Sequence, residues 1–172
     1  MDPEDFDEPP AHKLQGPLLT EPISSLQLGP AITVPLTATL QQAVEIMQTR
    51  HLGCVLVVDG AGVLKGIFTE RDLLGRVAGR KLDWNTALVS EFMTAEPESL
   101  QSGDAIAWAL NLMHVGGYRH VPLTDDGGKP TGVVSVKDIV AFIVDLFPDE
   151  VLNLPPDPRQ KPGPVDLGGG AD

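Results

Sequence analysis

The chain has 172 residues, of which 24 are acidic and 12 are basic, giving a formal net charge of −12 at pH 7. A surface this negative repels phosphate backbones and anionic lipids, so the composition argues against nucleic-acid and membrane partners. No apolar run approaches the roughly 20 residues that a membrane span requires. The single cysteine, Cys54, excludes an internal disulfide and favours a reducing compartment. Because the first segment is acidic, unlike a signal peptide, we expect a cytoplasmic protein.

The N-terminal segment divides into two parts of different composition. Residues 1–16 are acidic and contain little apolar surface, which predicts a disordered tail. The next segment, up to residue 28, has enough apolar side chains to pack against a domain: Leu18, Leu19, Ile23, Leu26 and Leu28. We expect it to form a lead-in to the first folded unit.

The first folded unit reads strand, helix, strand, strand, helix. A short strand is expected at 32–34, after which Thr39 and Gln42 form the capping box of a one-sided apolar helix. Strands at 54–58 and 63–68 flank a turn at 59–62 whose Asp and Gly residues tolerate positive φ. Thr69 then caps a second helix, which carries Leu73, Leu74 and Val77.

The same unit occurs a second time, in register. Gly66 through Asp72 corresponds to Gly132 through Asp138, and the alignment holds without a gap from about Ile23/Val89 to Val77/Ile143. Two copies of one supersecondary unit can share a core, so neither needs to be stable alone. The register divides the chain into a lead-in and first repeat at 17–81 and a linker and second repeat at 82–147.

The second repeat has more apolar helices than the first. Its hairpin strands are expected at 121–124 and 131–134, and its helices at 105–115 and 139–147. Trp108 and Leu112 widen the apolar surface of the first helix, and 139–144 is apolar all round, so one core cannot cover both helices. This pattern predicts a homodimer through these helices, unless the lead-in or the C-terminal segment covers them within one chain. Residues 148–172 form a Pro- and Gly-rich C-terminal tail, of which the final dozen residues are expected to be flexible.

A strand-helix-strand-strand-helix unit in tandem, ending each time in Gly-apolar-apolar-Ser/Thr-x-x-Asp, resembles the paired cystathionine-β-synthase (CBS) domains known as a Bateman module. The resemblance covers residues 20–147 and includes the lead-in Glu91-Phe92-Met93-Thr94. It implies an α/β (α+β) fold in which two βαββα repeats, related by a pseudo-twofold axis, pack sheet to sheet with their helices outside. It also implies two clefts that bind adenosine compounds such as AMP, ADP, ATP or S-adenosylmethionine.

The resemblance assigns one cleft to Asp138, whose carboxylate would accept both ribose hydroxyls, and to Ser135, whose hydroxyl would help to hold a phosphate. Arg119 and His120 match the basic pair that reaches phosphates in the family. The remaining residues of this cleft would form an apolar wall for the adenine: Ile32, Leu52, Cys54 and Val133.

The second cleft would use Ile67, Thr69 and Asp72, and we expect it to be the weaker site. Glu98 stands where the first cleft has Ile32, and Gly53-Cys54 stands in place of Arg119-His120. A nearby carboxylate disfavours an anion by about 1 kcal/mol or more at short range. Asp138→Ala should therefore weaken adenosine binding far more than Asp72→Ala.

Two other interpretations of these motifs are open. Thr69 with Asp72, and Ser135 with Asp138, also fit helix-capping pairs that need no ligand, as in a purely structural interaction module. An enzyme that uses Asp138 and His120 is a third possibility, but the histidines show no zinc spacing with Cys54 and no Ser/His/Asp arrangement can be assembled. We predict a regulatory module without catalytic residues, metal or required cofactor, which binds an adenosine ligand and signals to a separate effector protein.

Overall fold

The computed structural model describes residues 16, 20–146, 148 and 154. The tails expected at 1–16 and 148–172 lie outside the described residues, apart from Gly16, Pro148 and Leu154. The expected elements are present in the expected order. The first repeat contains β1 (Thr33–Pro35), α2 (Leu40–Thr49), β2 (Cys54–Val58), β3 (Leu64–Thr69) and α3 (Glu70–Asp72). The second contains β4 (Thr94–Ala95), α4 (Ile106–Val115), β5 (His120–Thr124), β6 (Pro130–Ser135) and α5 (Val136–Leu146).

Local signals explain where the helices begin. Thr39 and Gln42 form the expected capping box of α2, since Thr39 Oγ1 accepts from the Gln42 amide at 3.2 Å and the Thr39 amide donates to Gln42 Oε1 at 3.0 Å. The helix after Thr69 differs from the expectation, because α3 continues as η2 (Leu73–Val77), a π-helical turn. Two further short helical turns, η1 (Ile23–Ser25) and η3 (Val89–Glu91), form the lead-in segments.

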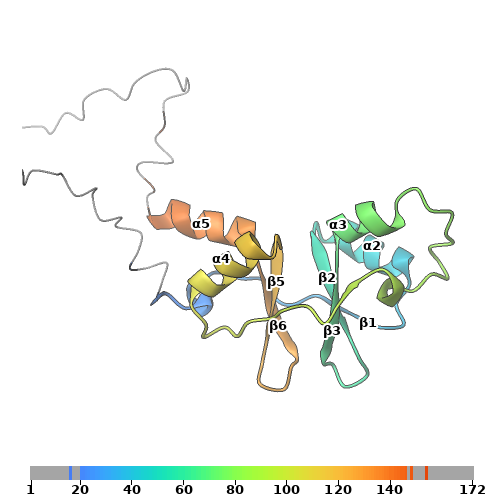
Figure 1. Cartoon of the computed structure of the whole chain (residues 1–172), viewed down its shortest axis with the longest axis horizontal. Coiled ribbons are helices and arrows are strands. Elements are labelled where there is room, and N and C mark those ends of the chain that lie inside the picture. Colours follow the sequence, from blue (N-terminus) through green and yellow to red (C-terminus); the bar gives the residue numbers. More distant parts are fainter. Residues whose placement is uncertain (1–15, 17–19, 147, 149–153, 155–172) are drawn as a thin grey trace, which may run out of the picture.

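The strands form two sheets that face each other, with the helices on the outside (Figure 1). In the first sheet, β1 runs parallel to β2, β2 pairs with β3 as an antiparallel hairpin, and β4 is added to the free edge of β3. The second hairpin, β5–β6, is extended by single bridges from Leu100 to Leu123 and from Pro30 to Gly132. The two-repeat mixed α/β fold predicted from the sequence is confirmed.

Each lead-in packs on the repeat that it does not precede in the chain. The Ile23 amide donates to Asp104 O at 2.8 Å, and the Ile106 amide donates to Glu21 O at 2.9 Å. In the other half, the Val89 amide donates to Ala38 O at 2.9 Å. As a result, the core of the second repeat contains Ile23 and Leu26, and the core of the first contains Val89 and Phe92.

A third, smaller apolar cluster lies between the two sheets. It consists of Cys54, Leu56 and Ile67 from the first hairpin, with Val133 of β6 packed against them. This contact holds the two hairpins face to face. Polar residues at the ends of their strands therefore line the space between the repeats.

Candidate functional site

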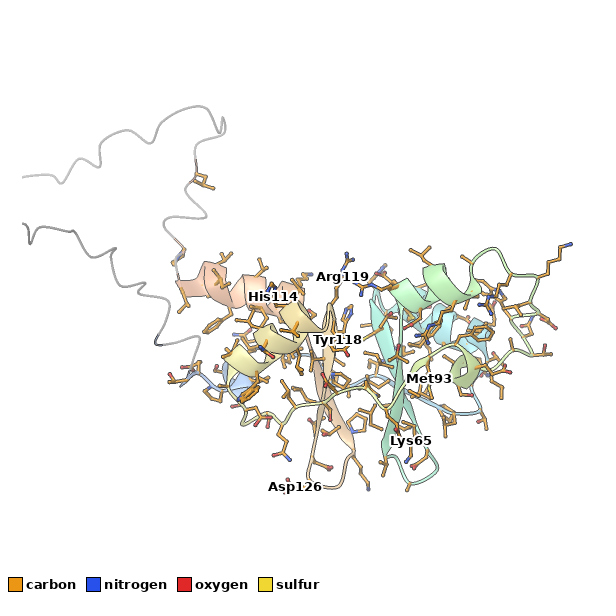
Figure 2. All side chains as sticks on the ribbon, viewed as in Figure 1. Lys65, Met93, His114, Tyr118, Arg119 and Asp126 are labelled. Carbon is orange, nitrogen blue, oxygen red and sulfur yellow. The ribbon has the colours of Figure 1, made fainter. Side chains whose placement is uncertain are left out.

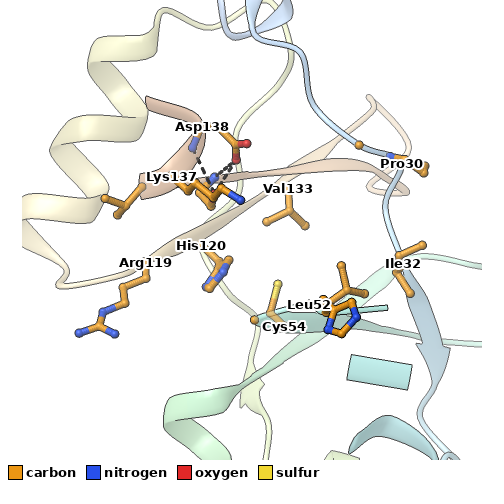
Figure 3. A pocket seen from close by; sticks show the side chains of 14 residues that line it. Pro30, Ile32, Leu52, Cys54, Arg119, His120, Val133, Lys137 and Asp138 are labelled. Atoms are coloured by element: carbon orange, nitrogen blue, oxygen red, sulfur yellow. Dashed lines mark hydrogen bonds between the residues drawn. The ribbon is translucent and has the colours of Figure 1, made fainter. Parts of the chain in front are cut away.

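The structure brings together all eight residues that the sequence assigned to the stronger cleft. They line one cavity of about 450 Å³ between the two hairpins, which we call the Asp138 cavity (Figure 3). Three segments supply its walls: residues 29–32 before β1, residues 51–54 at the start of β2, and the ends of β5 and β6 with the first turn of α5. Their proximity is therefore a property of the fold, whereas their binding role remains a prediction.

Ser135 and Asp138 make the helix-capping contact that the sequence analysis gave as an alternative to ligand binding. Asp138 Oδ2 accepts hydrogen bonds from the Ser135 amide at 2.7 Å and from Ser135 Oγ at 2.6 Å. Asp138 Oδ1 makes no hydrogen bond or ion pair to any residue in the described part of the chain, and the side chain is only half-buried. The cap therefore holds the carboxylate in place and leaves one oxygen for a ligand.

The opposite wall of the cavity is apolar. Ile32, Leu52, Cys54 and Val133 surround a space that suits a flat heteroaromatic ring. Burial, and secondarily the charge of Glu70, raises the pKa of the Cys54 thiol to about 12. Cys54 is thus a protonated thiol at neutral pH and contributes to the wall as a small apolar side chain.

Arg119 and His120 lie at the mouth of the cavity, at the beginning of β5. Arg119 is exposed, and its guanidinium has no hydrogen-bonded or ionic partner among the described residues. Burial lowers the pKa of His120 below its usual value, and Arg119 acts in the same direction, while Glu70 and Asp138 oppose the shift. At neutral pH His120 is therefore mostly the neutral imidazole, and Arg119 supplies the permanent charge.

Sequence reasoning missed two residues with ionisable side chains in this cavity, His51 and Lys137. Lys137 lies in the first turn of α5, where its ammonium adds a second cation beside Asp138. A signal for it was present, because Arg71 stands at the equivalent position of the first repeat and a basic residue thus precedes both aspartates. His51 has a positive φ of 54°, and its equivalent, Gly117, has a φ of 66°.

A second cavity, also of about 450 Å³, contains Ile67, Thr69 and Asp72, and we call it the Asp72 cavity. Glu98 lines it, as the register predicted. Here both carboxylate oxygens are engaged. Asp72 Oδ2 accepts from the Thr69 amide at 3.0 Å and from Thr69 Oγ1 at 2.8 Å, while Oδ1 accepts from Thr94 Oγ1 at 3.3 Å and lies 3.4 Å from Arg76 Nε. Asp72 is only 7% exposed, so it has little capacity left for a ligand.

The premise that the Asp72 cavity lacks basic residues needs revision. Arg71 and Arg76 line it, and so do Arg119 and His120. Two of these arginines already donate a hydrogen bond to a backbone carbonyl. Arg71 Nη1 donates to Gly117 O at 2.8 Å, and Arg76 Nη1 donates to Met93 O at 2.6 Å. Three arginines also face four carboxylates there, from Glu70, Asp72, Glu96 and Glu98, whereas an arginine and a lysine face one carboxylate in the Asp138 cavity.

Two further properties concern metals and membranes. Within residues 20–146, no three His, Cys, Asp or Glu side chains come close enough together to hold a metal ion. None of the helices in the described part of the chain is both long and apolar enough to span a membrane.

Comparison with known proteins agrees with this architecture. The sequence matches the CBS domain family twice, at residues 23–79 and 89–145. A CBS domain-containing protein of Arabidopsis thaliana, CBSCBSPB1, is 32% identical over 125 residues, which are 73% of this chain but only 22% of that protein.

Two solved structures have the same fold at 22% identity, each with a TM-score of 0.65 over 73% of this chain and 97% of the other. One is the CBS domain protein PAE2072 from Pyrobaculum aerophilum complexed with AMP. The other is the CBS domain pair of protein MJ0100 in complex with 5′-methylthioadenosine and S-adenosyl-L-methionine. The family matches both repeats in the same register, and the fold is that of solved CBS domain pairs. This chain therefore belongs to the CBS domain family and carries two CBS domains in tandem.

Proposed function

We propose that this protein is a regulatory module that binds an adenosine-containing ligand in the Asp138 cavity and signals its presence to a separate protein. The observation that carries the proposal is the free Oδ1 of Asp138, held by the Ser135 cap at the edge of an apolar slot and beside two cations. Structures of the same fold hold AMP, or 5′-methylthioadenosine and S-adenosyl-L-methionine. Regulation then follows if the ligand binds one arrangement of the two repeats better than another.

Each part of an adenine nucleotide has a suitable partner in the cavity. The adenine ring fits between Ile32 and Val133, and the ribose hydroxyls would donate to Asp138. Phosphate oxygens would reach Arg119 and Lys137, neither of which has an ionic partner among the described residues. A ligand that lacks phosphate would use the wall and the carboxylate alone.

Calorimetric titration of the full chain with adenosine, AMP, ADP, ATP and S-adenosylmethionine tests the proposal. We expect at least one of them to bind, and we expect Arg119→Ala to weaken AMP, ADP and ATP while sparing adenosine. Equal losses of affinity for adenosine, AMP, ADP and ATP would show that Arg119 does not contact phosphate. Absence of heat from every ligand, with folded protein, would favour the ligand-free interaction module, and turnover of a nucleotide by pure protein would favour an enzyme.

Relative to His120→Gln, the affinity of the chain for AMP should rise as the pH falls from neutral, because a bound phosphate favours the charged form of His120. Burial holds the pKa of free His120 below its usual value, and a bound phosphate would raise it. Between the two values, binding takes up a proton, so lower pH favours the complex. The groups that act on His120 are Glu70, Asp138 and Arg119.

This pH dependence is measured by titrating the protein and His120→Gln with AMP at several pH values. The phosphate's own titration, with a pKa of about 6, is common to both proteins and cancels in the ratio of their affinities. A ratio that does not change with pH would remove His120 from the phosphate site. Adenosine, which has no phosphate, provides the control ligand.

We also propose that two copies of the chain pair through the helices of the second repeat. The lead-in packs beneath these helices, yet Trp108 remains 60% exposed, Val115 75% and Val140 53%. α4 contains no Asp, Glu, Lys or Arg, so two chains of net charge −12 can meet there without opposing like charges in the contact. The proposed compartment is the cytoplasm, where reducing conditions keep Cys54 as a thiol.

Light scattering of the purified chain is expected to give the mass of a dimer, and Trp108→Glu is expected to give a monomer. Leu74→Glu is a matched control, since Leu74 is an exposed apolar residue of the first repeat. A dimer that survives Trp108→Glu but is lost in Leu74→Glu would move the interface to the first repeat. A monomeric parent protein would contradict the proposed dimer, and the effector or the C-terminal segment would then be the candidates for covering these helices.

A further inference from the structure

One basic pair, Arg119 and His120, lines both cavities. The pseudo-twofold operation that relates the repeats places Gly53 and Cys54 at the equivalent positions, so the first repeat provides no second pair. Figure 2 shows Arg119 and Tyr118 at the junction of the two halves of the molecule, above the paired hairpins. The two cavities therefore have the same guanidinium and the same imidazole within their walls.

Glycine at position 53 allows this central placement of His120. A β-carbon on residue 53 would lie 2.7 Å from His120 Nε2 and 2.8 Å from Cε1, closer than such atoms approach in proteins. Glu70 lies on the side of the Asp72 cavity and Asp138 on the side of the other, and both carboxylates act on the imidazole. His120 is thus positioned between two carboxylates that belong to different cavities.

The other cations are less available to an anion in the Asp72 cavity than this pair. Arg71 is bonded to Gly117 O, Arg76 is bonded to Met93 O and lies beside Asp72, and Lys137 lines only the Asp138 cavity. An anion in the Asp72 cavity would face the carboxylates of Glu70, Glu96 and Glu98, and Arg119 is the arginine of that cavity whose guanidinium makes no hydrogen bond to the described residues. An anion in the Asp138 cavity would draw the same side chain toward itself.

We propose that Arg119 and His120 act as one shared donor pair that couples the two cavities, so that an anionic ligand in the Asp138 cavity weakens binding of a second anion in the Asp72 cavity. This inference rests on the proposed function. One guanidinium cannot neutralise two phosphates at the same time, and the second phosphate is also repelled by the first. An uncharged ligand such as adenosine makes no demand on the pair and experiences no coupling.

The coupling is measured by comparing two ways of filling the Asp72 cavity with AMP. In the parent chain AMP enters it as the second ligand, whereas in Ile32→Trp the Asp138 cavity is filled by an uncharged side chain and AMP enters the Asp72 cavity first. Ile32 lines only the Asp138 cavity, so the substitution leaves the charges of both sites unchanged. Val133→Phe makes the same test if Ile32→Trp does not fold.

We expect AMP to bind the Asp72 cavity of Ile32→Trp at least about 5-fold more tightly than the second AMP binds to the parent chain. A factor of about 5 is the lower end of the usual range for coupling between two sites. Adding Arg119→Gln to both proteins should reduce this difference to the part that direct repulsion between the two phosphates contributes, while Arg80→Gln, a charge change at an exposed residue outside both cavities, should preserve it in full. Adenosine should show no difference in any variant.

The remaining outcomes overturn the inference in distinct ways. Equal affinities for AMP in the parent and Ile32→Trp would show that the cavities are independent. One site in the parent and none in Ile32→Trp would show that the Asp72 cavity takes no AMP, which leaves the proposed function of the other cavity intact. No binding of AMP to the parent, when another ligand of the calorimetric series binds, would overturn the inference alone. No binding of any ligand of that series would remove the proposed function together with the inference.

Discussion

Substitution of Asp138 by alanine is expected to lower the affinity of the chain for AMP by about 100-fold. Two charge-assisted hydrogen bonds to the ribose hydroxyls contribute about 1.5–3 kcal/mol each, and hydrogen bonds from the hydroxyls to water recover part of this binding energy in the variant. The expectation depends on the carboxylate geometry. Ser135 donates to Oδ2 from its amide and its hydroxyl, which leaves Oδ1 to face the cavity. Calorimetric titration of the parent and the variant gives the ratio directly.

Two further variants separate binding from folding in this experiment. Asp138→Ala also removes the contact of Asp138 with the Ser135 amide at the start of α5, at a cost to stability of about 1 kcal/mol. Asp138→Asn keeps an acceptor for that amide, removes the charge and replaces the second oxygen by an NH2 group. Asp72→Ala changes the equivalent residue, whose two oxygens are taken by Thr69, Thr94 and Arg76. A larger loss of AMP affinity in Asp72→Ala than in Asp138→Ala would reverse the predicted order of the two cavities.

The second large effect concerns stability. Ile23→Ala is expected to lower the free energy of unfolding by about 3 kcal/mol, within the range of about 2–5 kcal/mol for loss of a fully buried Ile side chain. Ile23 is 0% exposed and packs with Ile106, Val121 and Val134 in the core of the second repeat. Urea unfolding of the parent and the variant measures the difference.

The location of the damage provides a sharper test than its size. Because Ile23 precedes the first repeat in the chain but completes the core of the second, hydrogen exchange should accelerate in α4 and β5 more than in α2 and β2. Leu74→Ala, at a residue that is 73% exposed, should change stability by no more than about 0.5 kcal/mol. Faster exchange confined to the first repeat would contradict the observed packing of the lead-in.

Much of the candidate site could be predicted because its parts are local. The cap between Ser135 and Asp138 spans three residues, so the motif predicts the contact that the structure contains. The 66-residue register then carried the same assignment to Thr69 and Asp72, and their contact has the same geometry. The family resemblance supplied the distant residues of the Asp138 cavity, and all of them line it.

The charge balance of the second cavity could not be predicted in the same way. The sequence showed that Gly53 and Cys54 replace a basic pair, but Arg76 enters from η2 and donates to Met93 O, 17 residues away along the chain. Arg119 of the second repeat also lines the Asp72 cavity. The predicted weakness of the Asp72 cavity therefore rests on a revised argument, the occupied oxygens of Asp72 and the excess of carboxylates.

The order of the elements, the duplication and the apolar faces of the helices follow from the sequence, because apolar spacing, caps and turns act within a few residues. The residues that those faces contact depend on the tertiary packing. The sequence shows that Ile23 and Val89 are apolar, but it does not show which core each joins. In the structure each lead-in crosses to the other repeat, so Ile23 packs in the core of the second repeat and Val89 in the core of the first. The same packing places Arg119 and His120 where the two cavities meet. Contacts across a pseudo-twofold axis depend on how the two repeats pack together, and the sequence pattern within one repeat does not specify them.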